Sequence, residues 1–257
     1  MTLLESILLG LLEGFTEFLP ISSTGHLILA EHALGIGSDE FTKSFTIAIQ
    51  LGAILAVVLL YGNKLLRAPQ LIGKIAAAFI PTAIVGLTLY KFIKGYLLGN
   101  VAVVAWSLGI GGVLLIIFEM TRGKQLSATH DSIEDIPYWK AIVIGLAQSL
   151  AMIPGVSRSG ATIVGGVLLG LSREAIVEFS FLLAIPTMLS ATAYDLYKNA
   201  DQLSLDNAGL IAAGFVSAFL AAYVTAPALL RFIKSHSFIP FGIYRIVLAL
   251  VVAAVLI

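Results

Sequence analysis

Residues 10–26 read GLLEGFTEFLPISSTGH, and residues 145–161 read GLAQSLAMIPGVSRSGA. The two stretches lie over each other without a gap at an offset of 135 positions, so that Ser22 meets Ser157. Each begins as a short apolar helix and is then interrupted by Pro, Gly and hydroxyl side chains, which break helices. Two interrupted helices at corresponding places in the chain indicate a duplicated unit.

Two further blocks extend the match. Residues 45–50 (FTIAIQ) match 181–186 (FLLAIP), and residues 75–79 (IAAAF) match 211–215 (IAAGF), both at an offset of 136. Three blocks at nearly one offset predict a tandem duplication. We expect repeat one to span residues 1–118 and repeat two to span residues 139–257.

The composition predicts an integral membrane protein. Of 257 residues, 59% are hydrophobic and 12% are charged, and the mean hydropathy is +1.01, whereas soluble domains carry about 25% charge. The net charge is zero, which gives no support to polyanion binding. The absence of cysteine excludes disulfides, thiolate metal sites and a cysteine nucleophile. The N-terminus lacks a basic region and a cleavage site, so we expect no removable signal peptide.

Six segments are long enough to cross a bilayer, which takes about 20 apolar residues. They cover approximately residues 41–61, 75–94, 101–118, 173–196, 208–231 and 239–257. The interrupted regions are too short, and we expect re-entrant helix–loop–helix hairpins over residues 2–36 and 141–171. The predicted fold class is an all-α integral membrane protein with six transmembrane helices and two re-entrant hairpins, forming a single membrane domain of residues 1–257.

Each repeat then holds one hairpin and three membrane spans. Because three is odd, the second repeat must insert upside down, and inverted repeats place their broken helices face to face near the middle of the bilayer. Of the Lys and Arg residues, nine fall on one side of this topology and four on the other. The first side holds Lys64, Arg67, Lys74, Arg122, Lys124, Lys140, Arg173, Arg231 and Lys234, and the other holds Lys43, Lys91, Lys94 and Lys198. Since cytoplasmic loops carry the excess of Lys and Arg, we expect both termini and the entry of the first hairpin outside.

Glu13 and Glu17 are four residues apart, so on a helix both carboxylates project from one face. Two carboxylates so close repel each other, and their burial costs several kcal/mol unless something compensates. Oxygen ligands of this kind suit Mg²⁺ or Ca²⁺. A solvated pair at a helix end is the alternative, and the polar loop that follows favours the metal site.

Hydroxyl side chains open the short helix that follows each interruption. They are accompanied by His26 in the first copy and by Arg158 in the second. The complete set is Ser22, Ser23, Thr24 and His26, with Ser157, Arg158, Ser159 and Thr162 in the other copy. Ser and Thr at such positions often only cap the helix, but helix N-termini also bind phosphate, and a guanidinium matches phosphate bidentately. Capping does not account for an arginine at membrane depth, so we expect one anion site, suited to a diphosphate.

His26 follows Ser23 by three residues and can reach its hydroxyl or a bound phosphate, which suits a nucleophile and its base. Gln148, at the position of Glu13, is expected to line the same cavity, together with Gln50. Glu178 and Asp195 are expected to face the interior of the bundle, and Arg245 to snorkel towards the membrane surface.

These motifs resemble the signature regions of the bacitracin-resistance type of undecaprenyl-pyrophosphate phosphatase. The similarity rests on Glu13-x-x-x-Glu17, the SSTGH block ending at His26 and PGVSRSGAT at 154–162, and it extends to AIQLGAILAV at 48–57 and EFSFLLAIP at 178–186. It implies removal of the terminal phosphate of undecaprenyl pyrophosphate, which regenerates the lipid carrier of envelope polymers. It also implies dependence on Mg²⁺ or Ca²⁺, a homodimer, bacitracin resistance and a place in the bacterial cytoplasmic membrane. The family's functional residues fall on Glu13, Glu17, Ser22, Ser23, His26, Ser157, Arg158, Ser159 and Thr162.

On this interpretation Glu13 and Glu17 hold the metal, and the hydroxyl groups with Arg158 bind the diphosphate. Ser23 attacks with His26 or a glutamate as base, although direct attack by His26 or by metal-activated water fits the sequence equally. The substrate site opens to the outer, or periplasmic, side. A secondary transporter or lipid flippase is the competing hypothesis, because inverted repeats with paired hairpins also build transporters.

Overall fold

The computed structural model describes residues 1–37, 39–97, 100–122, 132–198, 207–233 and 235–256. Within these residues it contains ten α-helices and no strand. The helices are α1 (Leu3–Thr16), α2 (Ser23–Ala33), α3 (Glu40–Arg67), α4 (Pro69–Phe92), α5 (Val101–Arg122), α6 (Tyr138–Ser149), α7 (Arg158–Leu168), α8 (Arg173–Lys198), α9 (Ala208–Ile233) and α10 (Ile239–Leu256). Single turns of π- or 3₁₀-helix cover Ile93–Leu97 (η1), Ile133–Asp135 (η2) and Leu150–Met152 (η3).

Six of these helices are long and apolar enough to cross a membrane: α3, α4, α5, α8, α9 and α10. They coincide with the six segments predicted from length and hydropathy, so the all-helical class and the six spans are confirmed. Helix α3 continues beyond the predicted segment and ends where Pro69 begins α4. Proline is favoured at the first position of a helix because its missing N–H has no partner there anyway.

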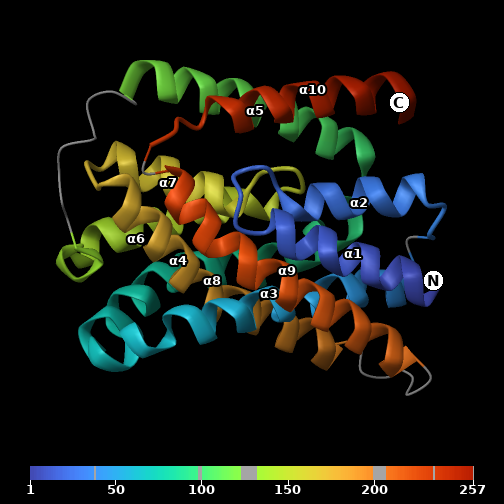
Figure 1. Cartoon of the computed structure of the whole chain (residues 1–257), viewed down its shortest axis with the longest axis horizontal. Helices are drawn as coiled ribbons and strands as arrows, with labels where there is room; N and C mark the ends of the chain where they lie inside the picture. Colours follow the sequence, from blue (N-terminus) through green and yellow to red (C-terminus); the bar gives the residue numbers. More distant parts are fainter. Residues whose placement is uncertain (38, 98–99, 123–131, 199–206, 234, 257) are drawn as a thin grey trace.

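Both chain termini lie at the same end of the molecule (Figure 1). Lys124, Lys234 and the side chain of Lys94, used to predict the orientation, lie outside the described residues.

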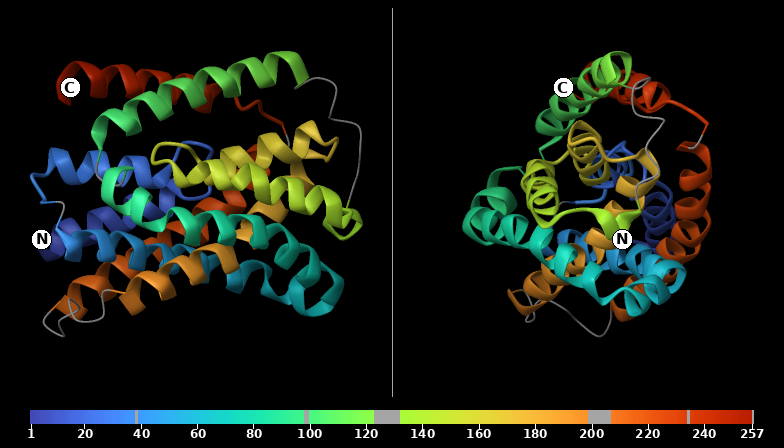
Figure 2. Two further views of the ribbon diagram at one scale, coloured as in Figure 1. Left: turned by 180° about the vertical axis from the view of Figure 1, so that it is seen from behind. Right: turned by 90° about the vertical axis from the view of Figure 1, so that its left-hand side faces the viewer.

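The two interrupted regions form helix–loop–helix hairpins. Helix α1 runs inward from the end that holds the termini and α2 returns to it, while α6 and α7 do the same from the opposite end (Figures 1 and 2). Ser22 and Ser157 each cap the second helix of their hairpin, accepting a hydrogen bond from the N–H of Gly25 and Gly160 respectively. The re-entrant position of these hairpins in a bilayer stays a prediction, as does the boundary between the repeats.

Matched glycines bring the hairpins against helices of the other half. A Cβ on Gly10 of α1 would collide with the carbonyl of Gly214 in α9, and a Cβ on Gly145 of α6 would collide with the carbonyl of Ala78 in α4. Small residues allow such close approach of helix backbones within membranes. Gly10 corresponds to Gly145 at the offset of 135 between the two halves, and Ala78 corresponds to Gly214 at the offset of 136. The same helix packing therefore occurs twice. This agreement supports the predicted duplication, and its inverted insertion stays a prediction.

Helices α5 and α10 pack chiefly against each other and form a separate layer along one side of the bundle (Figure 2). The remaining helices surround the two hairpin loops, which lie near the centre of the molecule (Figure 1). Asp195 is buried in this interior, where it accepts hydrogen bonds from Ser44 and Tyr90, as expected. Glu178 lies nearer the surface and pairs with Lys64 at 2.8 Å.

Candidate active site

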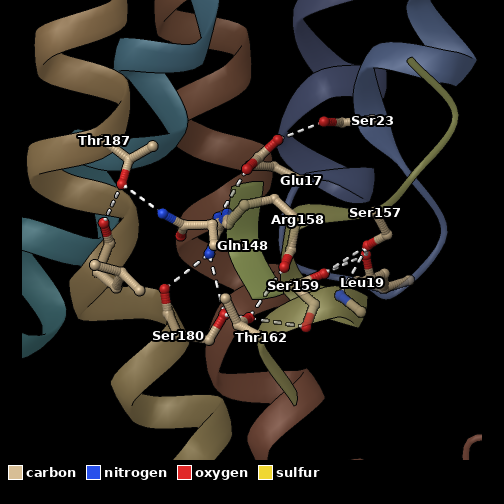
Figure 3. A network of polar contacts seen from close by, with 12 residues as sticks. Glu17, Leu19, Ser23, Gln148, Ser157, Arg158, Ser159, Thr162, Ser180 and Thr187 are labelled. Carbon is tan, nitrogen blue, oxygen red and sulfur yellow. Dashed lines mark hydrogen bonds and ion pairs between the residues drawn. The ribbon is translucent and has the colours of Figure 1, made fainter. Parts of the chain in front are cut away.

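The carboxylate of Glu17 joins the two hairpins. It follows the last turn of α1 and is 5% exposed. One of its oxygens forms an ion pair with Arg158 Nη2 at 2.8 Å, and the other accepts a hydrogen bond from the Ser23 hydroxyl (Figure 3). A buried carboxylate therefore meets a guanidinium from the second hairpin and a hydroxyl from the first.

Arg158 is held in place by groups on two helices. Its Nη1 donates to the backbone carbonyl of Ser180 at 2.7 Å and to the Ser180 hydroxyl at 3.2 Å. The Thr162 hydroxyl lies 2.6 Å from that of Ser180 and so supports the same anchor (Figure 3). The Nε of Arg158 is buried without a hydrogen-bond partner among the described residues. The charge of the guanidinium is balanced by Glu17, and Nε is the donor left without an acceptor from the protein.

The tips of the hairpins touch each other directly. The carbonyl of Leu19, in the first loop, accepts hydrogen bonds from the hydroxyl groups of Ser157 at 3.3 Å and Ser159 at 2.8 Å. These two serines come from the start of α7 and lie 2.9 Å apart. The sequence prediction that the two tips meet is therefore confirmed.

A cavity of about 570 Å³ opens beside this junction. Its polar end is lined by six of the ten predicted site residues, namely Glu17, Ser22, Ser23, Thr24, Ser157 and Arg158. Its apolar wall includes Phe79, Leu87, Met152 and Met188, from α4, η3 and α8. Gln50 and Gln148 also line the cavity, as the sequence predicted. One space thus combines a polar pocket and an apolar wall, as an amphiphile with a charged headgroup requires.

The other four predicted residues lie behind the cavity wall. Glu13 is fully buried, and neither of its oxygens has a hydrogen-bond partner within the part of the chain that the structure describes. Ser159 and Thr162 bind the Leu19 carbonyl and Ser180 instead of facing the cavity. Sequence reasoning cannot separate hydroxyl groups that face a ligand from those that hold a loop, because both belong at a helix N-terminus.

His26 contacts groups other than those expected. Its Nδ1 lies 2.7 Å from the carbonyl of Ser22, and its Nε2 lies 2.8 Å from the hydroxyl of Tyr244 on α10. Because a carbonyl only accepts, Nδ1 donates, and in the neutral ring Nε2 accepts from Tyr244. Ser22 has φ +72, a conformation that non-glycine residues rarely adopt. His26 therefore steadies a strained loop residue, while the Ser23 hydroxyl is bound by Glu17.

Arg245 was expected to snorkel towards the membrane surface, and that expectation is wrong. Its side chain is 3% exposed and donates to four backbone carbonyls. Two belong to the hairpin loops, Pro20 at 3.1 Å and Gly155 at 3.0 Å, and two to α5, Ser107 at 3.1 Å and Leu108 at 3.4 Å. These acceptors replace solvent, so the guanidinium need not reach the membrane surface. Arg245 thus ties both loops to the outer helix layer.

Sequence reasoning missed Ser180, Tyr244 and the role of Arg245. An ionisable residue within an apolar span is a functional candidate by default, and this signal was available for Arg245. Ser180 lies in a block, 178–186, that contributes to the family resemblance, but its contact with Arg158 follows only from the packing of α8 on α7.

The carboxylates of Glu13 and Glu17 are oxygen groups of the kind that a divalent cation takes as ligands, and such a cation would need its other ligands from elsewhere. No group of three or more His, Asp or Glu within the described ranges could hold a metal alone. Mg²⁺, however, is commonly bound by one or two carboxylates together with substrate phosphates and water. The two unpartnered oxygens of buried Glu13 call for a proton or a cation.

The fold and site define a polytopic helical membrane protein with a buried polar site between two helix hairpins. Residues 6–251 match the model of the family described as bacitracin resistance protein BacA. Similar proteins include three named undecaprenyl-diphosphatase. That of Aquifex aeolicus is 52% identical over 254 residues (99% of this chain and 98% of the relative), and that of Sulfurihydrogenibium sp. is 54% identical over 250 residues (97% and 98%). The relative from Thermus thermophilus is 48% identical over 252 residues (97% and 95%). This chain belongs to the bacitracin resistance protein BacA family.

Proposed function

We propose that this protein hydrolyses undecaprenyl pyrophosphate to undecaprenyl phosphate and inorganic phosphate, and so recycles the lipid carrier and confers bacitracin resistance. The observation that carries the proposal is the meeting of Arg158, Glu17 and Ser23 at the polar end of a cavity whose other walls are apolar. Relatives that match nearly the whole chain bear the name of this activity. The polar end suits the diphosphate, and the apolar wall suits the first units of the prenyl chain.

The diphosphate oxygens bind to Arg158, to the hydroxyl groups of Ser22, Thr24 and Ser157, and to the free N–H groups at the starts of α2 and α7. Ser159 and Thr162 contribute by holding the second loop and Ser180 in position. Charge develops on these oxygens during phosphoryl transfer, so preorganised donors stabilise the transition state more than the ground state. Arg158 exchanges part of its contact with Glu17 for the substrate.

Ser23 attacks the terminal phosphorus, the bond from that phosphorus to the bridging oxygen breaks, and undecaprenyl phosphate leaves. The hydrogen bond from Ser23 to Glu17 favours Glu17 as the group that takes the serine proton. Water then attacks the phosphoserine and releases inorganic phosphate. Direct attack by water, with Glu17 as base, uses the same contacts, whereas attack by His26 requires that it leave Ser22 and Tyr244.

Glu13 and Glu17 would hold Mg²⁺ or Ca²⁺, which supplies positive charge beside the diphosphate when bound. The protein lies in the cytoplasmic membrane with its site open to the outer, or periplasmic, side, as the asymmetry of Lys and Arg favours. It acts as a homodimer, in line with the family resemblance. The mass of the protein in detergent tests the dimer, and labelling of cysteines added at the termini of intact cells tests the orientation.

Phosphate release by the purified protein in detergent tests the reaction. We expect release from undecaprenyl pyrophosphate that a chelator abolishes and that Glu17→Ala lowers by at least about a hundredfold, since both the metal ligand and the base are lost. Glu178→Ala is the matched control, because it removes a carboxylate paired with Lys64 outside the cavity. A transporter or flippase without hydrolase activity would release no phosphate, and that result would refute the proposal.

A further inference from the structure

A second, smaller cavity of about 160 Å³ adjoins the candidate active site. It shares seven of its twelve lining residues with the larger cavity, among them Thr24 and Gln50, so the two cavities lie on either side of a common wall. From this junction it extends between α2 and α3. Its far end is lined by residues from the end of α2 and the start of α3, on the side of the molecule that holds both chain termini (Figure 1).

One face of α2 forms a wall of this smaller cavity. Thr24, Ile28 and Glu31 line it at a spacing of four and then three residues, which places them on one stripe of the helix. Thr24 lies at the active site and Glu31 at the far end. Glu31 is 7% exposed and accepts a hydrogen bond from the Thr46 hydroxyl at 2.6 Å. A protein hydroxyl therefore holds this carboxylate at the far end of the cavity.

The facing stripe of α3 presents the same kinds of side chain, but in the opposite order along the chain. Lys43, Ile47 and Gln50 line the cavity, again at a spacing of four and three. Gln50 lies at the active site and Lys43 at the far end, where its amino group pairs with Glu40 at 2.9 Å. The two stripes therefore present polar amide and hydroxyl groups inside, an apolar collar of Ile28 and Ile47, and ionisable groups at the mouth.

The two ionisable residues at this mouth have no counterparts at the corresponding described positions of the second half. At the offset of 135, Glu31 corresponds to Gly166, and at 136, Lys43 corresponds to Phe179. Phe179 is fully buried, and a side chain on Gly166 would collide with Ile176. Among the described residues, this pair of ionisable side chains therefore lies beside the first hairpin, at the end of the molecule that holds both chain termini.

We propose that this passage between α2 and α3 is the route by which water enters and inorganic phosphate leaves, with Lys43 as the phosphate contact at its mouth. The inference rests on the proposed function. Hydrolysis yields one product that belongs in lipid and one that belongs in water. The lipid product withdraws along the apolar wall of α4 and α8, and while it fills that opening the phosphate needs a separate polar exit.

Cysteine accessibility tests the passage, and the natural absence of cysteine makes single substitutions clean. Ile28→Cys places a thiol on the collar, and Ile163→Cys is its match at the offset of 135, on a buried side chain outside both cavities. We expect a small anionic, membrane-impermeant methanethiosulfonate to modify Ile28→Cys at least about tenfold faster than Ile163→Cys, since thiol reactions depend on access. Inorganic phosphate should slow this modification. Equal rates at the two positions, or no protection by phosphate, would overturn the proposal.

Product inhibition tests Lys43. We expect Lys43→Gln to raise the inhibition constant of inorganic phosphate about two- to fivefold, as the loss of one exposed charge interaction predicts. Lys91→Gln removes an exposed lysine that lines neither cavity and should leave the constant unchanged. Identical constants in the two variants would remove Lys43 from the route. Cysteine modification does not require turnover, so failure of the proposed hydrolysis and failure of the passage give separate results.

Discussion

Replacement of Arg158 by lysine keeps the positive charge and removes the geometry of the guanidinium. Arg158 makes three hydrogen bonds to protein groups, one to Glu17 and two to Ser180, and it lines the polar end of the cavity. A lysine ammonium on a flexible stem cannot hold Glu17, Ser180 and two phosphate oxygens at once. Hydrogen bonds to charged groups contribute about 1.5–3 kcal/mol each. Loss of one in the transition state lowers kcat/KM by about 10- to 100-fold.

The assay is phosphate release from undecaprenyl pyrophosphate in detergent, with kcat and KM determined separately. Arg173→Lys is the control, because Arg173 pairs with Glu119 at 2.7 Å but lies outside the cavity. We expect its kcat/KM to stay within about twofold of the wild type, because this pair, although largely buried, does not line the cavity. Thermal unfolding of both variants checks that they fold. If Arg158→Lys were as active as Arg173→Lys, the guanidinium would not bind the transferring phosphate.

Three further substitutions probe the loops and the nucleophile. If the serine attacks, Ser23→Ala should lower kcat by at least about a thousandfold and abolish a trapped phosphoenzyme. A near-normal kcat would instead leave water as the nucleophile, with Glu17 as its base. Arg245→Met should lower both the thermal unfolding midpoint and kcat, because the loop carbonyls of Pro20 and Gly155 lose the donor that Arg245 supplies, at about 1–3 kcal/mol for each one left unpaired. An unchanged midpoint would refute its role in tying the loops together. Tyr244→Phe removes one neutral hydrogen bond to His26, so we expect the unfolding free energy to fall by about 0.5–1.5 kcal/mol. We expect kcat to stay within about tenfold of the wild-type value. A larger loss of kcat than that of Ser23→Ala would place Tyr244 in the chemistry.

The spans and the meeting of the hairpin tips were predictable from sequence for physical reasons. Hydrocarbon thickness sets a length that six segments satisfy. The Pro- and Gly-containing stretches at the offset of 135 fail that length and carry groups that lipid would penalise. Such groups require partners within the protein, and each interrupted helix supplies partners for the other. The ion pair between Glu17 of the first hairpin and Arg158 of the second is an example.

The parts that were not predictable depend on which helix faces meet. Nothing in the apolar stretch 239–257 indicates that Arg245 would find four backbone carbonyls on three other segments. Snorkelling is the ordinary behaviour of a cation in a span, and only tertiary packing excludes it here. The same holds for His26, whose spacing from Ser23 fits a base but whose ring lies between Ser22 and Tyr244.

The duplication explains why the candidate site is complete only when both halves meet. Capping hydrogen bonds recur at the common offset, since the hydroxyl groups of Ser22 and Ser157 accept from the N–H groups of Gly25 and Gly160. The ionisable groups do not recur, because Glu17 corresponds to Met152 and Ser23 corresponds to Arg158. Had both halves kept the carboxylate, the two tips would have brought like charges together in a dry interior, which is unfavourable. Ser23 and Arg158 instead approach the single carboxylate of Glu17 from equivalent positions of the two hairpins. One shared framework therefore holds two different donors against one acceptor, and neither half contains that arrangement alone.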